Sequence, residues 1–366
     1  MKILYDAPFY SKPKAGIARY LHEISKIASD QNNVWFSRRT SLSSHHQNHV
    51  HLPSFPHFRP HRLSFFLEKL SFKFQSTQQK FDIVHAGEFA FTPAGLLALS
   101  KGAAKIITIH DLIHEKFGAP GSLYVPEKRR SFYQSADGLI FVSKSTRSDF
   151  FSHYDLCAES TPHAVVHHGM TFQARRPIQA EKSNQFLYVG SRSGYKNFPQ
   201  ALEAFQMHCV KNPDARLLVA GTAPTSEDLR LSKPIEKQVD WLENPDDEQL
   251  LEAYRKCIAL LYVSKYEGFG LPLLEAMSQG CIPIAGNHSS IPEVMGEGGF
   301  LINDVSSSRE IAKAMNYLAK NETLRNQYVS AGFERCSTFS WQRATKETLS
   351  LYKNALTNKT RIRKSK

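Results

Sequence analysis

The stretch that most constrains the fold runs from Ile258 to Gln279. It opens with IALLYVS, an apolar run of strand length. After a glycine-containing loop comes LPLLEAMSQ, whose composition is helical, with Pro272 suited to the first turn and Gly280 as a stop. A strand, a short loop and a helix in this order form the repeating unit of parallel sheets. The stretch therefore predicts an α/β fold.

The loop between this strand and this helix has the chemistry of a binding site. Gly268 and Gly270 let the backbone approach a ligand closely, and the N-terminus of the following helix favours an anion such as phosphate. Glu267 and Glu275 repel phosphate but accept hydrogen bonds from hydroxyl groups. The combination indicates a ligand that carries both phosphate and sugar-like hydroxyls. The simpler alternative is a surface loop whose glycines only turn the chain.

The string EGFGLPLLE, from Glu267 to Glu275, resembles the nucleotide-sugar signature of retaining glycosyltransferases, specifically glycosyltransferase family 4. The resemblance implies that Glu275 holds the nucleotide ribose and that Glu267 lies by the donor sugar. It also implies that the loop backbone serves the sugar and the phosphates, at Gly268, Phe269, Gly270 and Leu271.

A second candidate region follows another strand-like run, FLYVG, which ends at Gly190. The turn beyond it carries Arg192 and Lys196, a planar fork and a point charge that together suit a pyrophosphate. Basic loops are common on protein surfaces, but this one matches the family pattern in which these two positions neutralise the leaving diphosphate. By that resemblance Arg192 and Lys196 are catalytic, and Gly190 contacts the donor.

Two further candidates lie in the first half of the chain. His110 follows the strand-like run AKIITI, and the string ITIHDLIHEKF resembles the family strand that carries a donor-facing histidine. Gly16 stands in the turn between a strand at 2–8 and a helix at 17–28, a Rossmann-like opening. Family members often have paired glycines here, whereas this chain has Gly16 alone, which we assign to donor binding.

At 366 residues the chain exceeds the usual size of a single core, and strands alternate with helices in both halves. We predict a first Rossmann-like domain at 1–168 for the acceptor, a linker at 169–184 and a second at 185–340 for the nucleotide-sugar. The resemblance implies the GT-B fold, two doubly wound domains facing across a cleft. The C-terminal segment 341–366 is expected to pack back on the first domain and to end in a disordered basic tail from Asn358.

The net charge and the hydropathy of the chain limit which classes of partner it can bind. The net charge of +12 attracts polyanions, but no nucleic-acid-reading motif is present, so we expect no nucleic acid partner. The segment 61–75 is amphipathic, basic and rich in Phe, which fits either an anionic membrane surface or a helix facing the core. No apolar stretch is long enough to cross a bilayer and no signal peptide opens the chain. We expect a cytoplasmic protein, peripheral on the inner face of the membrane.

The sequence thus predicts a hexosyltransferase that uses a GDP-, UDP- or ADP-sugar and a glycan or lipid-linked acceptor in cell-surface polysaccharide or lipopolysaccharide synthesis. Retention of configuration is implied by the resemblance alone. No metal and no other cofactor are expected, because cations and a helix end can stabilise the leaving group and no DxD pair is suitably placed. The five scattered cysteines predict neither disulfides nor zinc. A nucleotide-sugar epimerase or hydrolase, or a noncatalytic binding protein, are the open alternatives.

Overall fold

The structure is a computed structural model. It describes residues 1–6, 16–36, 49–51, 66–67, 70, 74, 80–87, 102–118, 126–156, 161–174, 184–192 and 194–364. The chain divides into two compact units, one formed by 1–169 with 340–366 and the other by 170–339. Most of the amphipathic segment 61–75, and residues 175–183 of the predicted linker, lie outside the described residues.

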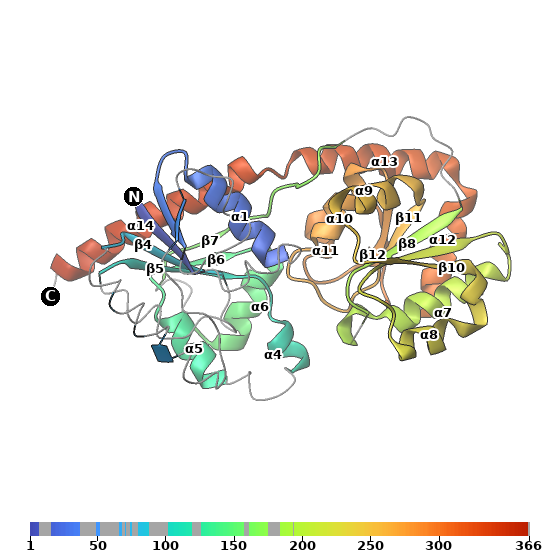
Figure 1. The fold of residues 1–366 in the computed structure, drawn as a ribbon, viewed down its shortest axis with the longest axis horizontal. Coiled ribbons are helices and arrows are strands. Elements are labelled where there is room, and N and C mark those ends of the chain that lie inside the picture. The colour runs from blue at the N-terminus through green and yellow to red at the C-terminus, as the bar shows by residue number, and fades with distance from the viewer. Residues whose placement is uncertain are drawn as a thin grey trace. The chain divides into compact units, whose positions relative to one another are not determined.

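The first unit alternates strands with helices, as the sequence predicts (Figure 1). Its elements are β1 (Lys2–Asp6), α1 (Gly16–Ala28), β2 (Asn33–Phe36), β3 (His49–His51), β4 (Ile83–Ala86), β5 (Ala104–Ile109), α4 (Ile113–Phe117), α5 (Pro126–Gln134), β6 (Gly138–Phe141), α6 (Lys144–Tyr154), β7 (His163–Val165) and α14 (Trp341–Lys364).

The strands of this unit form one parallel sheet in the order β3-β2-β1-β4-β5-β6-β7. The order reverses direction between β1 and β4, as in doubly wound folds. One apolar layer packs α1 and α14 against a face of the sheet, and a second layer packs α5 and α6 against the other (Figure 1). Burial on both faces explains the nearly continuous apolar runs of β4, β5 and β6.

Helix α14 joins the first unit although it comes last in the chain. It contacts α1, β5, β6 and β7, and the Tyr352 hydroxyl lies 2.5 Å from Nδ1 of the buried His85 on β4. The prediction of a disordered tail from Asn358 is wrong, because the helix continues to Lys364. Lys359 anchors this part by donating to the Ala103 carbonyl and pairing with Asp137 at 2.6 Å.

The second unit repeats the alternation (Figure 1). Its elements are β8 (Gln185–Val189), the short 3-10 helix η2 (Gly194–Lys196), α7 (Phe198–Cys209), β9 (Arg216–Gly221), α8 (Ser226–Ser232), the 3-10 helix η3 (Lys233–Gln238), β10 (Val239–Glu243), α9 (Asp247–Lys256), β11 (Ala259–Tyr262), α10 (Leu271–Ser278), β12 (Ile282–Gly286), α11 (Ile291–Met295), β13 (Phe300–Ile302), α12 (Ser308–Lys320) and α13 (Glu322–Ser337).

All strand pairs of the second sheet are parallel, in the order β10-β9-β8-β11-β12-β13. The direction reverses between β8 and β11, where Ala259 pairs with Phe186. Helices α7 and α12 cover one face with a large apolar core, and α9 and α10 lie over the other (Figure 1). The predicted fold class, a doubly wound α/β sheet in each half, is confirmed.

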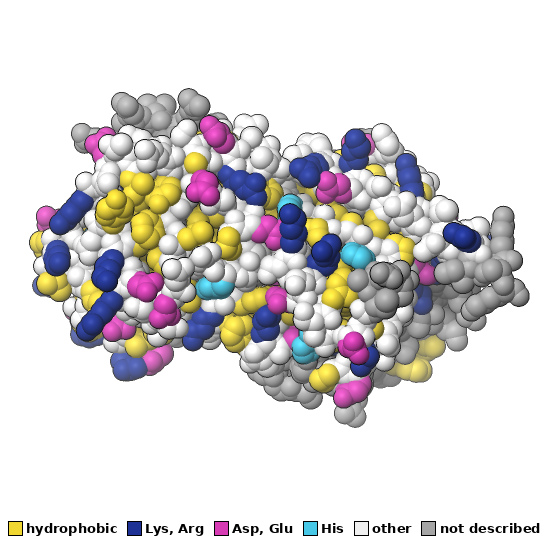
Figure 2. Space-filling view, turned by 180° about the vertical axis from the view of Figure 1, so that it is seen from behind, with side chains coloured by type: hydrophobic (Ala, Val, Ile, Leu, Met, Phe, Trp, Pro, Cys, Tyr) yellow, Lys and Arg dark blue, Asp and Glu magenta, His cyan; other side chains and the backbone are white. Residues whose placement is uncertain are grey.

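None of the described helices combines the length and the apolar character that crossing a bilayer requires. On the face drawn in Figure 2, Lys and Arg side chains are scattered among Asp and Glu over the described surface. The described cationic side chains of this face therefore do not gather in one basic stripe.

Candidate functional site

The candidate site of the second unit lies where β8 and β11 end, next to each other in the sheet. This reversal point is where open α/β sheets bind ligands, beyond the carboxyl ends of the strands. Gly190 follows β8 with φ of 111°, a left-handed conformation that favours glycine. Its N–H donates to the Ala220 carbonyl at 2.9 Å, which ties the start of the loop to β9.

The loop after β8 carries Lys196 to the loop after β11. Lys196 Nζ lies 2.6 Å from Glu267 Oε1, and both side chains are largely buried, at 19% and 9% exposure. The buried Tyr188 hydroxyl donates to the Ser191 and Lys196 carbonyls at 2.8 and 3.1 Å, which fixes the backbone of this loop. The structure therefore brings together one predicted cation and one predicted carboxylate that are distant in sequence.

The Glu267 loop is braced by two serines that the sequence analysis did not single out. Ser289 Oγ accepts from the Glu267 N–H at 3.2 Å. The buried Ser290 hydroxyl donates to the carbonyls of Glu267 and Phe269 at 2.8 and 2.9 Å. Both serines follow β12, the neighbour of β11, so the order of strands could have placed them here, but no local pattern marks their contacts.

The glycine loop leads into α10 as predicted. Gly270 is the N-cap with φ of 105°, and Pro272 occupies the first turn. Gly268 and Phe269 are buried, and Leu271 is half-buried at the first position of the helix. Pro272 has no N–H, and the Leu273 N–H donates to the Gly270 carbonyl at 3.0 Å, so this helix end favours an anion chiefly through its positive dipole.

Glu275 lies one turn further along α10 and is 6% exposed. Its Oε2 accepts from the Tyr254 hydroxyl of α9 at 3.0 Å. An ionised carboxylate accepts several hydrogen bonds, so Glu275 can accept one from a ligand hydroxyl as well as the one from Tyr254.

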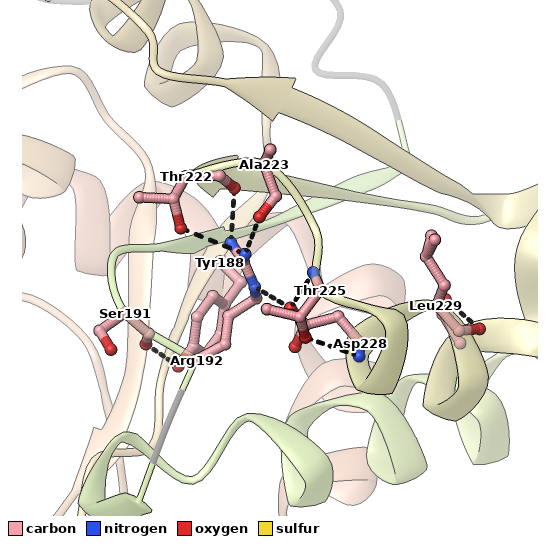
Figure 3. Close-up of polar contacts among 9 residues, drawn as sticks. Tyr188, Ser191, Arg192, Thr222, Ala223, Thr225, Asp228 and Leu229 are labelled. Carbon is pink, nitrogen blue, oxygen red and sulfur yellow. Dashed lines mark hydrogen bonds and ion pairs between the residues drawn. The ribbon is translucent and has the colours of Figure 1, made fainter.

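The Arg192 side chain binds the segment that follows β9 (Figure 3). Nε donates to Asp228 Oδ2 at 2.9 Å, Nη1 to the Thr222 carbonyl at 3.0 Å, and Nη2 to the Ala223 carbonyl at 2.7 Å. Burial alone would raise the pKa of Asp228, but hydrogen bonds from Thr225 and from Arg192 hold that pKa below its ordinary value. Arg192 and Lys196 therefore have different ion-pair partners, Asp228 and Glu267.

His110 and Gly16 belong to the first unit. Gly16 is the exposed first residue of α1. His110 follows β5, and its ring meets Tyr20 edge-on with centroids 5.0 Å apart. No described residue lies within hydrogen-bond distance of the buried His110 Nε2. Burial lowers the pKa of His110 from 6.5 to about 3, so the imidazole is neutral near pH 7.

Among the described residues, no three His, Cys, Asp or Glu side chains gather in a way that could hold a metal ion. The described part of the second unit offers a buried lysine beside a carboxylate, a helix N-terminus and a second buried carboxylate. This arrangement can stabilise negative charge and accept hydrogen bonds from hydroxyls.

Comparison with known proteins agrees with this chemistry. Residues 15–173 match "Glycosyltransferase Family 4", and residues 171–335 match "Glycosyl transferases group 1". The chain is 26% identical over 270 residues to O-antigen chain mannosyltransferase B of Escherichia coli, a match that covers 68% of this chain and 70% of that protein. It is 32% identical over 135 residues to the serotype-specific mannosyltransferase WbdA of Escherichia coli, covering 36% of this chain but only 16% of WbdA.

Solved structures share the fold. HepE of Anabaena in complex with UDP superposes with a TM-score of 0.74 at 18% identity, covering 96% of this chain and 100% of that one. WaaG, a glycosyltransferase involved in lipopolysaccharide biosynthesis, gives 0.70 at 15% identity, covering 94% and 98%. The two family matches together run from residue 15 to residue 335. The chain therefore belongs to the GT-B glycosyltransferases, with a family 4 first half and a group 1 second half.

Proposed function

We propose that this glycosyltransferase moves a hexose from a GDP-, UDP- or ADP-sugar to a hydroxyl of a glycan or lipid-linked acceptor, with retention of configuration, in cell-surface polysaccharide or lipopolysaccharide synthesis. The mannosyltransferase relatives from Escherichia coli support a mannose donor as the first candidate.

The observation that carries the proposal is the Lys196–Glu267 pair, 2.6 Å apart beside the glycine loop and the N-terminus of α10. We assign Lys196 and the helix end to the diphosphate, Glu275 to the ribose hydroxyls, and Glu267 and His110 to the donor sugar. The backbone at Gly190, Gly268, Phe269, Gly270 and Leu271, with Gly16 from the first unit, completes the donor contacts in this proposal.

In the chemical step, the bond between the anomeric carbon and the bridging phosphate oxygen breaks, and its electron pair leaves on the diphosphate. The acceptor oxygen bonds to the same carbon from the face that the leaving group occupied, and its proton passes to the departing diphosphate oxygen. Lys196 and the N-terminus of α10 meet the charge that grows on the diphosphate, which is the main catalytic task in such a transfer. These groups supply positive charge of their own, so we propose that the reaction needs no metal.

We further propose that the protein attaches peripherally to an anionic membrane on its cytoplasmic side. Of the segment 61–75, the described residues 66, 67, 70 and 74 are helical. Phe66, Leu70 and Phe74 follow one another at four-residue steps, which is the spacing of neighbouring residues on a helix surface. They are 57%, 48% and 65% exposed, so these apolar side chains are not buried in the core.

The test of the function is transfer itself. Purified protein is incubated with GDP-mannose, UDP-glucose or ADP-glucose and a lipid-linked glycan acceptor, and products are identified by mass spectrometry and by NMR of the anomeric linkage. We expect one donor to be used, the donor's anomeric configuration to be kept, and activity to persist in EDTA. Release of free sugar without a glycan product would favour a hydrolase, and donor binding without turnover would favour a binding protein.

A further inference from the structure

Arg192 and Lys196 lie on the same loop, yet the structure gives them different surroundings. Lys196 faces Glu267, while each guanidinium nitrogen of Arg192 donates to residues 222–228, which run from the end of β9 into α8 (Figure 3). The Arg192 side chain is 5% exposed, and its guanidinium lies 5.5 Å from the ring centre of Trp241 on β10. Hydrogen bonds along the edge of the guanidinium and an aromatic ring against its face together fix its orientation.

The partner of Arg192 is itself fixed. Asp228 Oδ2 accepts from the N–H and the hydroxyl of Thr225, both at 2.8 Å, as well as from Arg192 Nε. The Asp228 N–H in turn donates to Thr225 Oγ1, which completes a capping box at the start of α8. Arg192 therefore binds a segment that already has defined geometry, and links it to the loop after β8.

This link forms one wall of a pocket. The pocket has a volume of about 560 Å³ and lies at the ends of β8 and β9, lined in part by Gly190, Ser191, Gly221, Thr222 and Thr225. Gly190 and Gly221 are close neighbours, since a Cβ added to Gly221 would meet the Gly190 carbonyl oxygen at 2.8 Å. A movement of either loop would therefore change the pocket and the backbone that leads to Lys196.

We infer that Arg192 is a positioning residue, which holds the loop after β8 and the segment 222–228 together at the edge of the donor site, and that it is not a ligand of the leaving diphosphate. The inference rests on the proposed function for its effect on donor binding. It departs from the prediction made from the sequence, in which Arg192 and Lys196 share the diphosphate.

The first arm of the test is a double-mutant cycle in thermal unfolding, which needs no ligand. Arg192→Ala and Asp228→Asn should each lower the unfolding midpoint by roughly 5 °C or more, because each leaves a largely buried charge without its opposite charge. The unfolding midpoint of the double variant should fall by about as much as that of the less stable single variant. Arg216→Ala is the matched control, since it breaks an Arg–Asp pair of the same unit that is 47% and 38% exposed, and it should change the midpoint little.

The second arm compares UDP with uridine and GDP with guanosine, by calorimetry or ligand-detected NMR. A residue that touches the phosphates affects only the diphosphates, so Lys196→Ala should lower diphosphate affinity at least tenfold and leave nucleoside affinity unchanged. Arg192→Ala, Arg192→Lys and Asp228→Asn should lower both affinities by the same factor. Arg192→Lys retains the charge but lacks the fork, so a purely electrostatic role would be rescued by it.

Selective loss of diphosphate affinity in Arg192→Ala, with native affinity in Asp228→Asn and with rescue by Arg192→Lys, would overturn the inference. Additive losses in the unfolding cycle would overturn it as well. If the native protein binds neither nucleoside diphosphate, the proposed function fails, and the unfolding cycle still decides whether Arg192 positions this segment.

Discussion

Lys196 is the residue whose removal tests the proposed chemistry most directly. Its charge should stabilise the leaving diphosphate more in the transition state than in the bound donor. Lys196→Ala should therefore lower kcat by roughly 100- to 1,000-fold, the loss seen when one group that stabilises developing charge is removed, and change the donor KM much less.

The control for Lys196 is Lys265→Ala, an exposed lysine two positions before Glu267. It should keep native kinetics. Steady-state rates of both variants, measured with donor and acceptor varied separately, give kcat and KM for comparison with the native protein, after circular dichroism confirms folding. A native kcat in Lys196→Ala would remove Lys196 from the chemical step, and a raised donor KM at unchanged kcat would make it a binding residue only.

Glu275 should act through the ribose and not through the base. Glu275→Gln keeps an acceptor for Tyr254 but loses the charge, so nucleotide affinity should fall by about 1.5 to 3 kcal/mol, the value of a hydrogen bond to a charged group. In the same titration, a 2′,3′-dideoxy nucleotide should bind the native protein more weakly than the normal nucleotide by the same amount. The Tyr254→Phe variant, which keeps the carboxylate, should show a smaller loss of nucleotide affinity. Native binding of the dideoxy analogue would show that Glu275 has another role.

Side-chain partners show where prediction from the sequence stops at this scale. The glycine loop, Glu267 and Glu275 follow from one contiguous string, and the backbone there adopts the predicted strand, loop and helix. The partner of Arg192 is 36 residues away, and Ser290 reaches the Glu267 carbonyl across 23 residues. Periodicity and turn chemistry describe local backbone, so they give no information about which distant side chains meet.

At the scale of single elements, the described face formed by Phe66, Leu70 and Phe74 predicts membrane binding. Replacing all three with Ser should lower recovery with anionic vesicles at least about tenfold, since each large apolar side chain contributes up to roughly 1.5–3 kcal/mol when buried. Binding of the native protein should weaken as ionic strength rises. Vesicle flotation measures both effects.

The matched control for this face is Val210→Ser, which changes an apolar side chain of the second unit that is 82% exposed and should leave recovery unchanged. Equal recovery of the native protein with neutral vesicles, or none with either kind, would rule out electrostatic attachment to a membrane. The acceptor would then have to reach the enzyme from solution.

Elements with a strong period were predictable to the residue. An example is SREIAKAMNYLAK, whose apolar residues recur at helical spacing and which forms α12 at Ser308–Lys320. The end of α14 was missed because the sequence from Asn358 is polar and basic, which is typical of a disordered tail. Its helical state depends on tertiary contacts of Lys359 with Ala103 and Asp137, and these contacts join segments more than 200 residues apart.

At the scale of the whole molecule, the buried histidines of the first unit predict sensitivity to acid. Burial, with nearby His110, lowers the pKa of His85 to about 3, and burial, with nearby His110 and His167, lowers that of His168 well below 6.5. Below about pH 6.5 these histidines are protonated in the unfolded chain but stay neutral in the folded protein. The free energy of unfolding is therefore highest above that pH and falls as the pH drops.

At pH 5.5 each of these two histidines should cost about 1.4 kcal/mol of folding free energy. Thermal unfolding at pH 7.5 and 5.5 measures the loss. His85→Gln should make the dependence shallower, whereas His153→Gln, which changes an exposed histidine, should leave it as it is. An unfolding midpoint that is the same at both pH values would contradict the buried neutral state of these rings.

The division of the chain has a consequence for how it is made. The face of the first sheet that holds Ile3, Ile83 and Ile140 is completed by α14, which the ribosome synthesises only after the whole of residues 170–339. At roughly 5–20 residues per second, that interval is on the order of 10 to 30 seconds. The second unit is contiguous and can finish folding during this time, while the first waits with an apolar face uncovered. The half made first is thus the half completed last, and it is the part of the nascent chain with most need of a chaperone.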